Sequence, residues 1–449
     1  MTNTNAPSPE LLSPAGNMEK LKYALAFGAD AVYAGIPRYS LRTRENDFNT
    51  GNLPEAIAYT HALGRKIYMT MNIYAHNAKV EGFRKMLDQV AEWQPDGLIM
   101  SDPGLIKMVL QNYPELPVHL STQANVTNWT AVEFWRDLGV QRVILSRELS
   151  LKEIATMHEM VPDVELESFV HGAICIAYSG RCLISNYLTH RDANQGTCTN
   201  SCRWPYLIKK EKPSLVEWEE QQHAHTERIY PDSTALQLED PTRPGNEFPV
   251  SEDEQGTYLF NAKDLCAVEL LTELRDAGVI SFKIEGRTKS SYYTALATRA
   301  YRQAIDDMNS GKPFSENNLR DLFSLSNRQY TTGFYRRNPR HLGENRLESR
   351  SIERSHRAVG IDPQYDSDRG LVSFEVRNRL ERGTAVDVIT PDRIIPAVIQ
   401  ELYNDKEMPV DVVHGGAGRC WFPLEVDPGA FALVRRELYP AEQKDSLEG

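Results

Sequence analysis

The 449-residue sequence lacks any apolar run close to the roughly 20 residues that a helix needs to cross a bilayer, so we expect no membrane span. Its first residues, MTNTNAPSPELLSPAGN, also lack the basic stretch and the apolar segment of a secretion signal. We therefore expect a cytoplasmic protein. In a reducing compartment, clustered cysteines are more often metal or redox ligands than disulfide partners.

Positive charge is scarce as well. The chain has 50 lysines and arginines against 62 acidic residues, and its formal net charge is -12. Non-specific binding of nucleic acid requires positive charge facing the phosphates. The negative net charge therefore argues against a protein that binds polyanions non-specifically. A nucleic-acid partner would require a local basic patch.

Motifs of the common hydrolases are missing too. His158 and Glu159 begin a His-Glu-x-x-His pattern but lack its second histidine, and there is no Gly-x-Ser-x-Gly elbow. The run HGGAG at 414–418 resembles an oxyanion loop only faintly and is predicted to be a turn. A papain-like pair of Cys175 and His171, four residues apart, stays open as an alternative.

What the sequence does contain is an alternation of short β-rich runs with amphipathic helical runs, which is typical of βα units. The eight candidate strands are 10–16, 30–35, 65–72, 96–102, 117–123, 142–148, 164–172 and 279–286. Eight such units predict a closed (β/α)8 barrel, with an open doubly wound sheet as the alternative. We expect a helix at 289–312 to close the barrel.

The predicted domains follow from this pattern. The barrel spans 1–330 and includes a long insertion at 173–278 between its seventh and eighth strands. A connector rich in arginine covers 331–356. From 357 to 449 the alternation changes to short β runs, which predict a small antiparallel β-barrel or sandwich.

Polar side chains stand at the ends of nearly all the candidate strands. They are Ser13, Asn72, Asp102, Gln123, Asn125, Arg147, Glu148, His171, Glu285 and Arg287. In a barrel the carboxyl ends of the strands meet at one face, where active sites are built. Each residue could instead cap the helix that follows it, but their recurrence at equivalent places predicts a shared polar pocket.

Four of the six cysteines fall in the first part of the insertion, with the spacing Cys-x6-Cys-x15-Cys-x3-Cys. They are Cys175, Cys182, Cys198 and Cys202. Four thiolates suit an iron-sulfur cluster, whereas structural zinc favours paired cysteines two to four residues apart, a spacing that only the last pair has. Their position directly after the seventh strand favours a redox centre over the barrel mouth. Cys266 and Cys420 are predicted to be packing residues, with Cys266 in reserve as a ligand.

The segment ESFVHGAICIAYSGRCLIS, Glu167–Ser185, resembles the signature of the collagenase-like peptidase family, E-x-F-x-x-G-A-x-C-x4-G-x-C-x-x-S. Supporting stretches such as ELLSPAG, SFKIEGRTKS and RQYTTGF run along almost the whole chain. Within the family, the chain is most similar to the members that hydroxylate tRNA. The resemblance implies a barrel that carries a 4Fe-4S cluster and hydroxylates the wobble uridine of tRNA to 5-hydroxyuridine. This reaction needs no molecular oxygen but requires prephenate.

The resemblance leaves one ligand open, because family members differ in where the fourth cysteine lies. We assign Cys202 as the fourth ligand, with Cys266 as the alternative. Two other functions remain as alternatives: a peptidase or collagenase-like hydrolase, and a zinc-stabilised RNA-binding protein without catalysis.

A local basic patch for tRNA is present in the sequence. Residues 327–357 hold eight arginines against three glutamates, with aromatic residues interleaved, which suits phosphate contacts and stacking on unpaired bases of an anticodon stem-loop. A solvated linker with internal ion pairs is the alternative. The candidate RNA contacts are Arg336, Arg337 and Arg340, together with Arg181 and Arg203 beside the cysteines.

The proposed chemistry requires a base flipped out of its stack, an electron donor, and cations for a small dianionic acid. Arg42, Arg147, Lys283 and Arg287 are the candidate cations, because guanidinium groups match carboxylates. Glu167 and His171 flank the cysteine segment and are candidate proton carriers, with an ion pair to arginine as the alternative for Glu167. Further candidates are Glu285 for catalysis and Asn72 and Gln123 for substrate binding.

Overall fold

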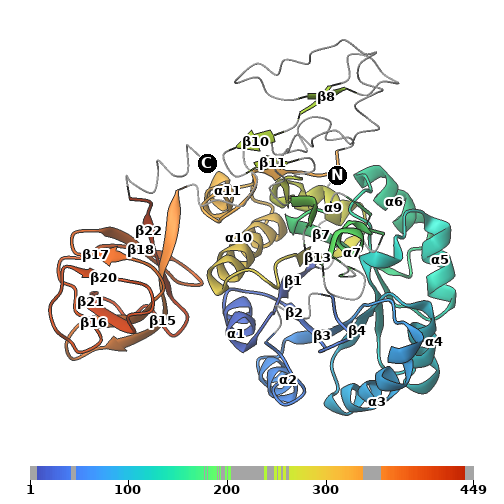
Figure 1. The fold of residues 1–449 in the computed structure, drawn as a ribbon, viewed down its shortest axis with the longest axis horizontal. Coiled ribbons are helices and arrows are strands. Elements are labelled where there is room, and N and C mark those ends of the chain that lie inside the picture. The colour runs from blue at the N-terminus through green and yellow to red at the C-terminus, as the bar shows by residue number, and fades with distance from the viewer. Residues whose placement is uncertain are drawn as a thin grey trace, which may run out of the picture.

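The computed structural model contains a barrel and a separate β domain (Figure 1). The structure describes residues 8–41, 47–175, 177–178, 181–189, 191, 193, 198–199, 201–203, 237–239, 247–249, 251–253, 256–258, 262–336 and 355–439. In this part of the chain, no helix combines the length and apolar character that a membrane span requires.

Eight parallel strands form a closed barrel. They are β1 (Glu10–Pro14), β2 (Ala31–Gly35), β3 (Lys66–Met71), β4 (Gly97–Met100), β5 (Val118–Leu120), β6 (Arg142–Ile144), β7 (Glu165–Ala173) and β13 (Val279–Ile284). β13 pairs with both β1 and β7, so the sheet has no gap at that point. The predicted barrel is confirmed, and the open sheet was the wrong alternative.

Helices cover the outside of the barrel (Figure 1). They are α1 (Met18–Ala26), α2 (Leu53–Ala62), α3 (Asn77–Trp93), α4 (Pro103–Asn112), α5 (Trp129–Asp137), α6 (Leu151–Met160), α9 (Leu271–Asp276) and α10 (Ser291–Asn309). Asp102 accepts hydrogen bonds from the backbone of Gly104 and Leu105, so this strand-end residue caps α4. Ser150 and Glu153 form a reciprocal capping box on α6. These caps start the helices close to the strand ends and so keep the loops at the barrel mouth short.

Short elements that the sequence pattern did not predict extend this framework. β12 (Asp264–Cys266) runs antiparallel to β7, and β14 (Tyr330–Thr331) runs parallel to β12. Their three and two residues are too few to show an alternation in the sequence. Helix α11 (Glu316–Phe323) follows α10. Within the insertion, β8 (Gln237–Glu239) pairs with β9 (Glu247–Pro249), and β10 (Ser251–Asp253) pairs with β11 (Gly256–Tyr258).

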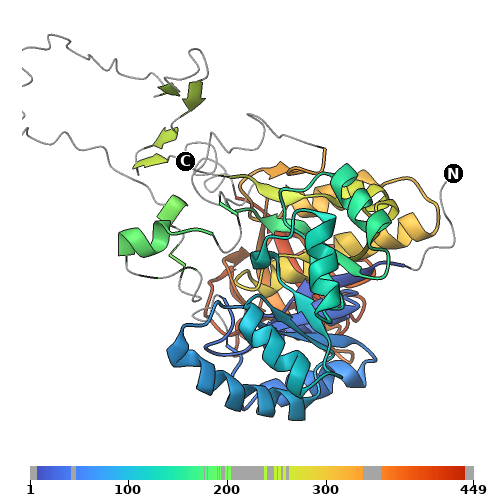
Figure 2. The same ribbon diagram turned by 90° about the vertical axis from the view of Figure 1, so that its right-hand side faces the viewer.

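The cysteine-bearing part of the insertion includes helix α7 (Ile184–Thr189) and a 3-10 turn at Ser201–Arg203. In Figure 1, α7 lies in front of the strands of the barrel, and in Figure 2 it stands off to one side of them. The two views together place this helix beyond one end of the barrel.

The β domain holds a six-stranded antiparallel sheet in the order β19-β18-β22-β15-β16-β21. Its strands are β15 (His356–Asp366), β16 (Leu371–Val376), β18 (Ala385–Ile389), β19 (Ile394–Val398), β21 (Arg419–Pro423) and β22 (Leu433–Glu437), with β17 (Leu380–Glu381) paired to β20 (Val412–Val413). The predicted all-β character is confirmed. Arg435 of β22 joins the two domains through Asp321 at 3.3 Å and Ser324 at 3.1 Å.

A buried charge network lies inside the barrel and extends from Glu10, the first residue of β1, to Lys283, near the carboxyl end of β13. Arg142 lies 2.6 Å from Glu10, 2.7 Å from Glu165 and 3.2 Å from Glu167. Lys283 contacts the other oxygen of Glu167 at 2.8 Å. Because buried charges are costly unless they are paired, these contacts explain how charged residues can stand on strands that form the core.

Glu10 makes the stability of the barrel depend on pH. Burial alone would raise its pKa, but Arg142 and hydrogen bonds from Tyr68 and Ser281 outweigh burial and hold the pKa below its usual value. A carboxyl whose pKa is lowered by folding stabilises the protein above its unfolded pKa, and this contribution is lost as pH falls through the folded pKa.

We therefore expect the free energy of unfolding to fall between about pH 5 and pH 3, and the Glu10→Gln variant to lose part of that dependence. Urea unfolding of both proteins at several pH values in this range measures the difference. Parallel curves for the two proteins would contradict the role of Glu10.

Candidate functional site

A cavity of about 170 Å³ opens at the carboxyl ends of the barrel strands. Its wall combines strand-end residues with the cysteine segment. The lining residues used below are Tyr33, Leu41, Thr70, Asn72, Ser121, Gln123, Arg147, Phe169, Cys175, Tyr178, Cys182, Cys198, Cys202, Lys283, Glu285 and Arg287. Pockets for drug-sized ligands usually enclose roughly 300 to 1,000 Å³, so this cavity is small by comparison.

Arg287 is fixed in the cavity wall by neutral groups. Its Nη1 donates to Ser40 Oγ and Thr70 Oγ1, both at 2.7 Å, and its Nη2 donates to the Leu41 carbonyl. The residue is only 6% exposed, so a guanidinium charge is held almost out of water at the edge of the cavity. A rigid guanidinium in this position matches a carboxylate or phosphate oxygen.

Two more cations line the same wall. The Arg147 guanidinium lies 3.8 Å above the Phe169 ring and 3.4 Å from Glu285. The Lys283 ammonium lies 4.3 Å above the Tyr33 ring. Burial lowers the pKa of Lys283, and the neighbouring Glu167 carboxylate opposes this shift. The structure thus brings together three of the four predicted cations, while the fourth, Arg42, lies outside the described residues.

A chain of side-chain amides also lines the cavity. The Leu41 backbone N–H donates to Asn72 Oδ1 at 3.1 Å, and Asn72 Nδ2 donates to Gln123 Oε1 at 3.2 Å. The hydroxyls of Ser101 and Ser121 donate to the same Gln123 oxygen. The prediction that Asn72 and Gln123 share one site therefore agrees with their observed contact.

All four clustered cysteines line this cavity, and no disulfide joins any of the six cysteines, each of which the structure describes. Within the described ranges, no three His, Cys, Asp or Glu side chains lie close enough to share one metal ion. The donors themselves fit an iron-sulfur cluster, because thiolates are its usual ligands. Cys202 lines the cavity and Cys266 does not, since Cys266 is buried beside Tyr301.

His171 does not line the cavity, contrary to the role that we predicted for it. Its ring is 1% exposed and packs among Tyr293, Tyr301 and Tyr330 at 5.3 to 5.7 Å. The reason is a register shift between β7 and β13, where Phe169 pairs with Lys283 but His171 already pairs with Ile284. This bulge removes the alternation that would have turned His171 inward.

The surroundings of His171 also remove its expected chemistry. Burial lowers its pKa to about 3, so the ring stays neutral at physiological pH. The papain-like pair is not formed at the cavity either, since Cys175 lines the wall and His171 lies behind it.

The two predicted carboxylates have different positions. Glu167 is fully buried and bound to Arg142 and Lys283, so the structure shows the ion pair that was its alternative role. Glu285 lines the cavity and contacts Arg147. The sequence pattern missed Tyr33 and Tyr178 in the wall. Tyr178 could have been found from its place between Cys175 and Cys182, although the family signature fixes no residue type there.

The predicted RNA contacts are only partly described. Arg181 is exposed, and Arg203 belongs to the turn Ser201–Arg203. The Arg336 side chain is 60% exposed and pairs with Glu273 at 3.2 Å. Arg337 and Arg340 lie outside the described residues.

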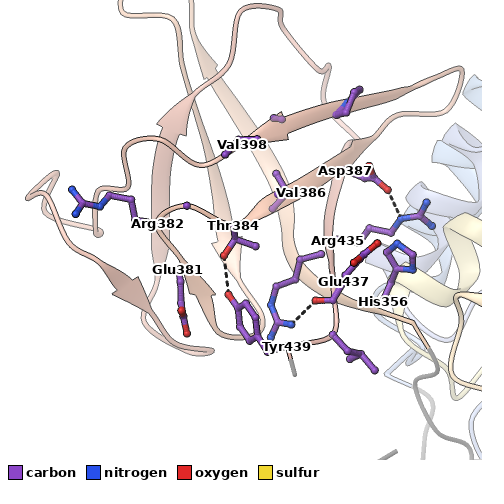
Figure 3. Close-up of a pocket in the computed structure, with 16 residues that line it drawn as sticks. His356, Glu381, Arg382, Thr384, Val386, Asp387, Val398, Arg435, Glu437 and Tyr439 are labelled. Atoms are coloured by element: carbon purple, nitrogen blue, oxygen red, sulfur yellow. Dashed lines mark hydrogen bonds and ion pairs between the residues drawn. The ribbon is translucent and has the colours of Figure 1, made fainter. Parts of the chain in front are cut away.

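The β domain contains a larger groove, of about 770 Å³, next to β18 and β22 (Figure 3). Its polar groups bind one another: Arg435 contacts Asp387 at 2.9 Å, and Thr384 contacts Tyr439 at 3.0 Å. The Arg436 guanidinium lies 3.5 Å above the Tyr439 ring. Because these groups already bind within the protein, the barrel cavity is the stronger candidate site despite its smaller volume.

Comparison with known proteins finds matches over nearly the whole chain. The model of Peptidase family U32 matches residues 16–345, and that of the Peptidase family U32 C-terminal domain matches residues 354–435. The chain is 45% identical over 442 residues to tRNA hydroxylation protein P of Escherichia coli, covering 96% of this chain and 97% of that protein. It is 46% identical over 444 residues to tRNA hydroxylation protein P of Haemophilus influenzae, covering 96% of each. The solved structure of the U32 peptidase Mk0906 is 14% identical, with a TM-score of 0.38, and covers 63% of this chain and 94% of that one.

Proposed function

The chain belongs to peptidase family U32, the collagenase-like peptidase family that its cysteine segment resembles, and we propose that it hydroxylates tRNA rather than cleaving peptides. Two relatives that are 45% and 46% identical over nearly the whole chain are named tRNA hydroxylation proteins. The match extends over both the barrel and the β domain.

The finer proposal is oxygen-independent conversion of the wobble uridine to 5-hydroxyuridine, with a 4Fe-4S cluster and prephenate. The observation that supports it best is a single cavity in which four cysteines face three cations and an amide chain. An iron-sulfur cluster, when bound, supplies one-electron transfer. Cys175, Cys182, Cys198 and Cys202 are the residues that would hold it, and an electron-transfer partner would be needed.

The remaining wall residues would bind and orient the reactants. A target base must leave its stack to enter the barrel mouth, and the half-exposed Tyr178 ring offers a face for it to stack on. Arg147, Lys283 and Arg287 would hold the carboxylates of prephenate, a small dianionic acid. Arg181, Arg203 and the arginines of the connector, including Arg336, would contact the anticodon stem-loop.

A peptidase mechanism has little support from the side chains. No histidine lines the cavity in the described part of the chain. Cys266 is the cysteine nearest to His171 in the β ladder, and burial raises the pKa of its thiol to about 11. A protonated, buried thiol is a poor nucleophile.

The proposed function is tested by mass spectrometry of tRNA nucleosides from a strain that lacks the gene. We expect 5-hydroxyuridine and its derivatives to disappear from the wobble position and to return when the intact gene is supplied. Wobble uridines that are unchanged in the deleted strain would contradict the proposal. Purified protein that cleaves denatured collagen would favour the peptidase alternative.

A further inference from the structure

We infer that Gln123 reads the target base by donating a hydrogen bond from its amide nitrogen to the ring carbonyl at C4, and that this donor selects uracil over cytosine. The inference rests on the proposed function, since it concerns the base that enters the same cavity. Gln123 is thus a specificity-determining residue. Asn72 is a positioning residue, because it acts by orienting the Gln123 amide.

The first step fixes the orientation of Asn72. A backbone N–H can only donate, so the Leu41 N–H at 3.1 Å requires the oxygen of the Asn72 amide on that side. The Asn72 nitrogen is then the atom that faces Gln123 at 3.2 Å and Ser121 Oγ at 3.4 Å. The order of the two amide atoms follows from a donor whose identity is certain.

The second step transfers this orientation to Gln123. Because Asn72 presents an N–H, the Gln123 atom that it meets must be the acceptor, Oε1. The Ser101 hydroxyl, at 3.3 Å, and the Ser121 hydroxyl also donate to this oxygen. Within the described part of the chain, the amide nitrogen of Gln123 has no hydrogen-bond partner, so it is the end of the side chain that remains for a bound molecule.

The third step concerns rigidity. The Gln123 backbone lies in a 3-10 turn, Thr122–Ala124, and its carbonyl accepts hydrogen bonds from Tyr74 Oη at 2.7 Å and Asn125 Nδ2 at 2.8 Å. Both the backbone and the amide oxygen of Gln123 are therefore held, and the N–H donor has a fixed place in the wall. A fixed donor discriminates between bases, whereas a rotating amide could offer either atom.

The chemistry of the two pyrimidines completes the argument. At C4 uracil carries a carbonyl acceptor, like thymine, and cytosine carries an amino donor. The Gln123 N–H groups can donate a hydrogen bond to the uracil carbonyl. They meet another donor in the cytosine amino group, with which they cannot form a hydrogen bond. C4 is bonded to C5, the carbon that the proposed reaction hydroxylates, so this contact would orient the ring edge that reacts.

The test uses two anticodon stem-loops that differ only in uridine or cytidine at the wobble position. Affinity is measured by fluorescence anisotropy at one salt concentration. Hydroxylation is measured by mass spectrometry after incubation in an extract of the gene-deleted strain supplemented with prephenate, because the extract supplies the electron-transfer partner that the proposed reaction needs. We expect the wild type to prefer uridine, and Gln123→Glu, which replaces the N–H donor by an acceptor in the same shape, to reduce the ratio of affinities roughly 10- to 100-fold.

A second variant, Asn72→Asp, is expected to change the preference for uridine over cytidine while leaving the Gln123 residue in place. In Asn72→Asp the Leu41 N–H still binds one oxygen, and the other oxygen now requires a donor from Gln123, so the Gln123 amide turns and presents its oxygen to the cavity. We expect the preference to shift toward cytidine by about 10-fold or more. A merely structural loss at Asn72 would lower both affinities and leave their ratio unchanged.

Gln89→Glu on the exposed face of α3 is the matched control, because it adds the same charge away from the cavity and should keep the wild-type ratio. Thermal unfolding of each variant checks that it is folded. If the wild type hydroxylates uridine but both cavity variants keep its ratio, the role of Gln123 is wrong and the proposed function stands. If the wild type hydroxylates neither stem-loop, the proposed function itself fails, and the affinity ratios still decide the role of Gln123.

Discussion

Changing Cys175 to serine is expected to give a colourless protein that forms no 5-hydroxyuridine. A serine hydroxyl stays protonated at neutral pH and is a far poorer iron ligand than a thiolate. Since Cys175 lines the barrel cavity beside the other three cysteines, its loss would remove one of four cluster ligands. Purification without oxygen should give a brown wild type with broad absorption near about 400 nm, and both iron and colour should be absent from the variant.

The same experiment decides the fourth ligand. Cys202→Ser should lose iron as Cys175→Ser does, because Cys202 also lines the cavity. Cys266→Ala should keep it, because Cys266 is buried beside Tyr301. Cys420→Ala, in the core of the β domain, is the control for loss of a buried thiol. A colourless wild type with one equivalent of zinc would overturn the cluster and favour the zinc-stabilised RNA-binding alternative.

The second large effect is expected on stability, from Glu167→Gln. Glu167 is fully buried, and its two oxygens contact Arg142 and Lys283. Glutamine at this position is neutral, so the buried positive charges of Arg142 and Lys283 would lose the negative charge that stabilises both of them. Breaking a buried ion pair by removing one partner costs roughly 3 to 5 kcal/mol, so we expect a fall of that size in the free energy of unfolding.

Glu165→Gln is the matched control for this prediction. Glu165 contacts the same Arg142 guanidinium at 2.7 Å, but its side chain is 49% exposed. Water can replace an exposed partner, so we expect a loss of only about 0 to 1 kcal/mol. Urea unfolding at pH 7, followed by tryptophan fluorescence, measures both variants. Equal losses would show that burial does not decide the strength of this network.

The sequence by itself predicted the elements of the barrel and the grouping of the cysteines. The eight strands were visible because each is a short β-rich run bounded by turn residues, and all but the seventh are followed by a helical period; these are local patterns. Asn72, Gln123, Arg147 and Arg287 were found for a related reason: each stands at a strand end, and the closure of a barrel brings all strand ends to one face.

Only the tertiary structure decided which way several of these side chains face. His171 turned outward because a bulge against β13 shifted the register of β7. Glu167 became an ion-pair partner because β6 brings Arg142 to one of its oxygens and β13 brings Lys283 to the other. The amide chain from Leu41 to Asn72 to Gln123 joins residues 31 and 51 positions apart. The face and the partners of a strand residue depend on its register with neighbouring strands, and this register is set by pairing between distant segments, which no local pattern contains.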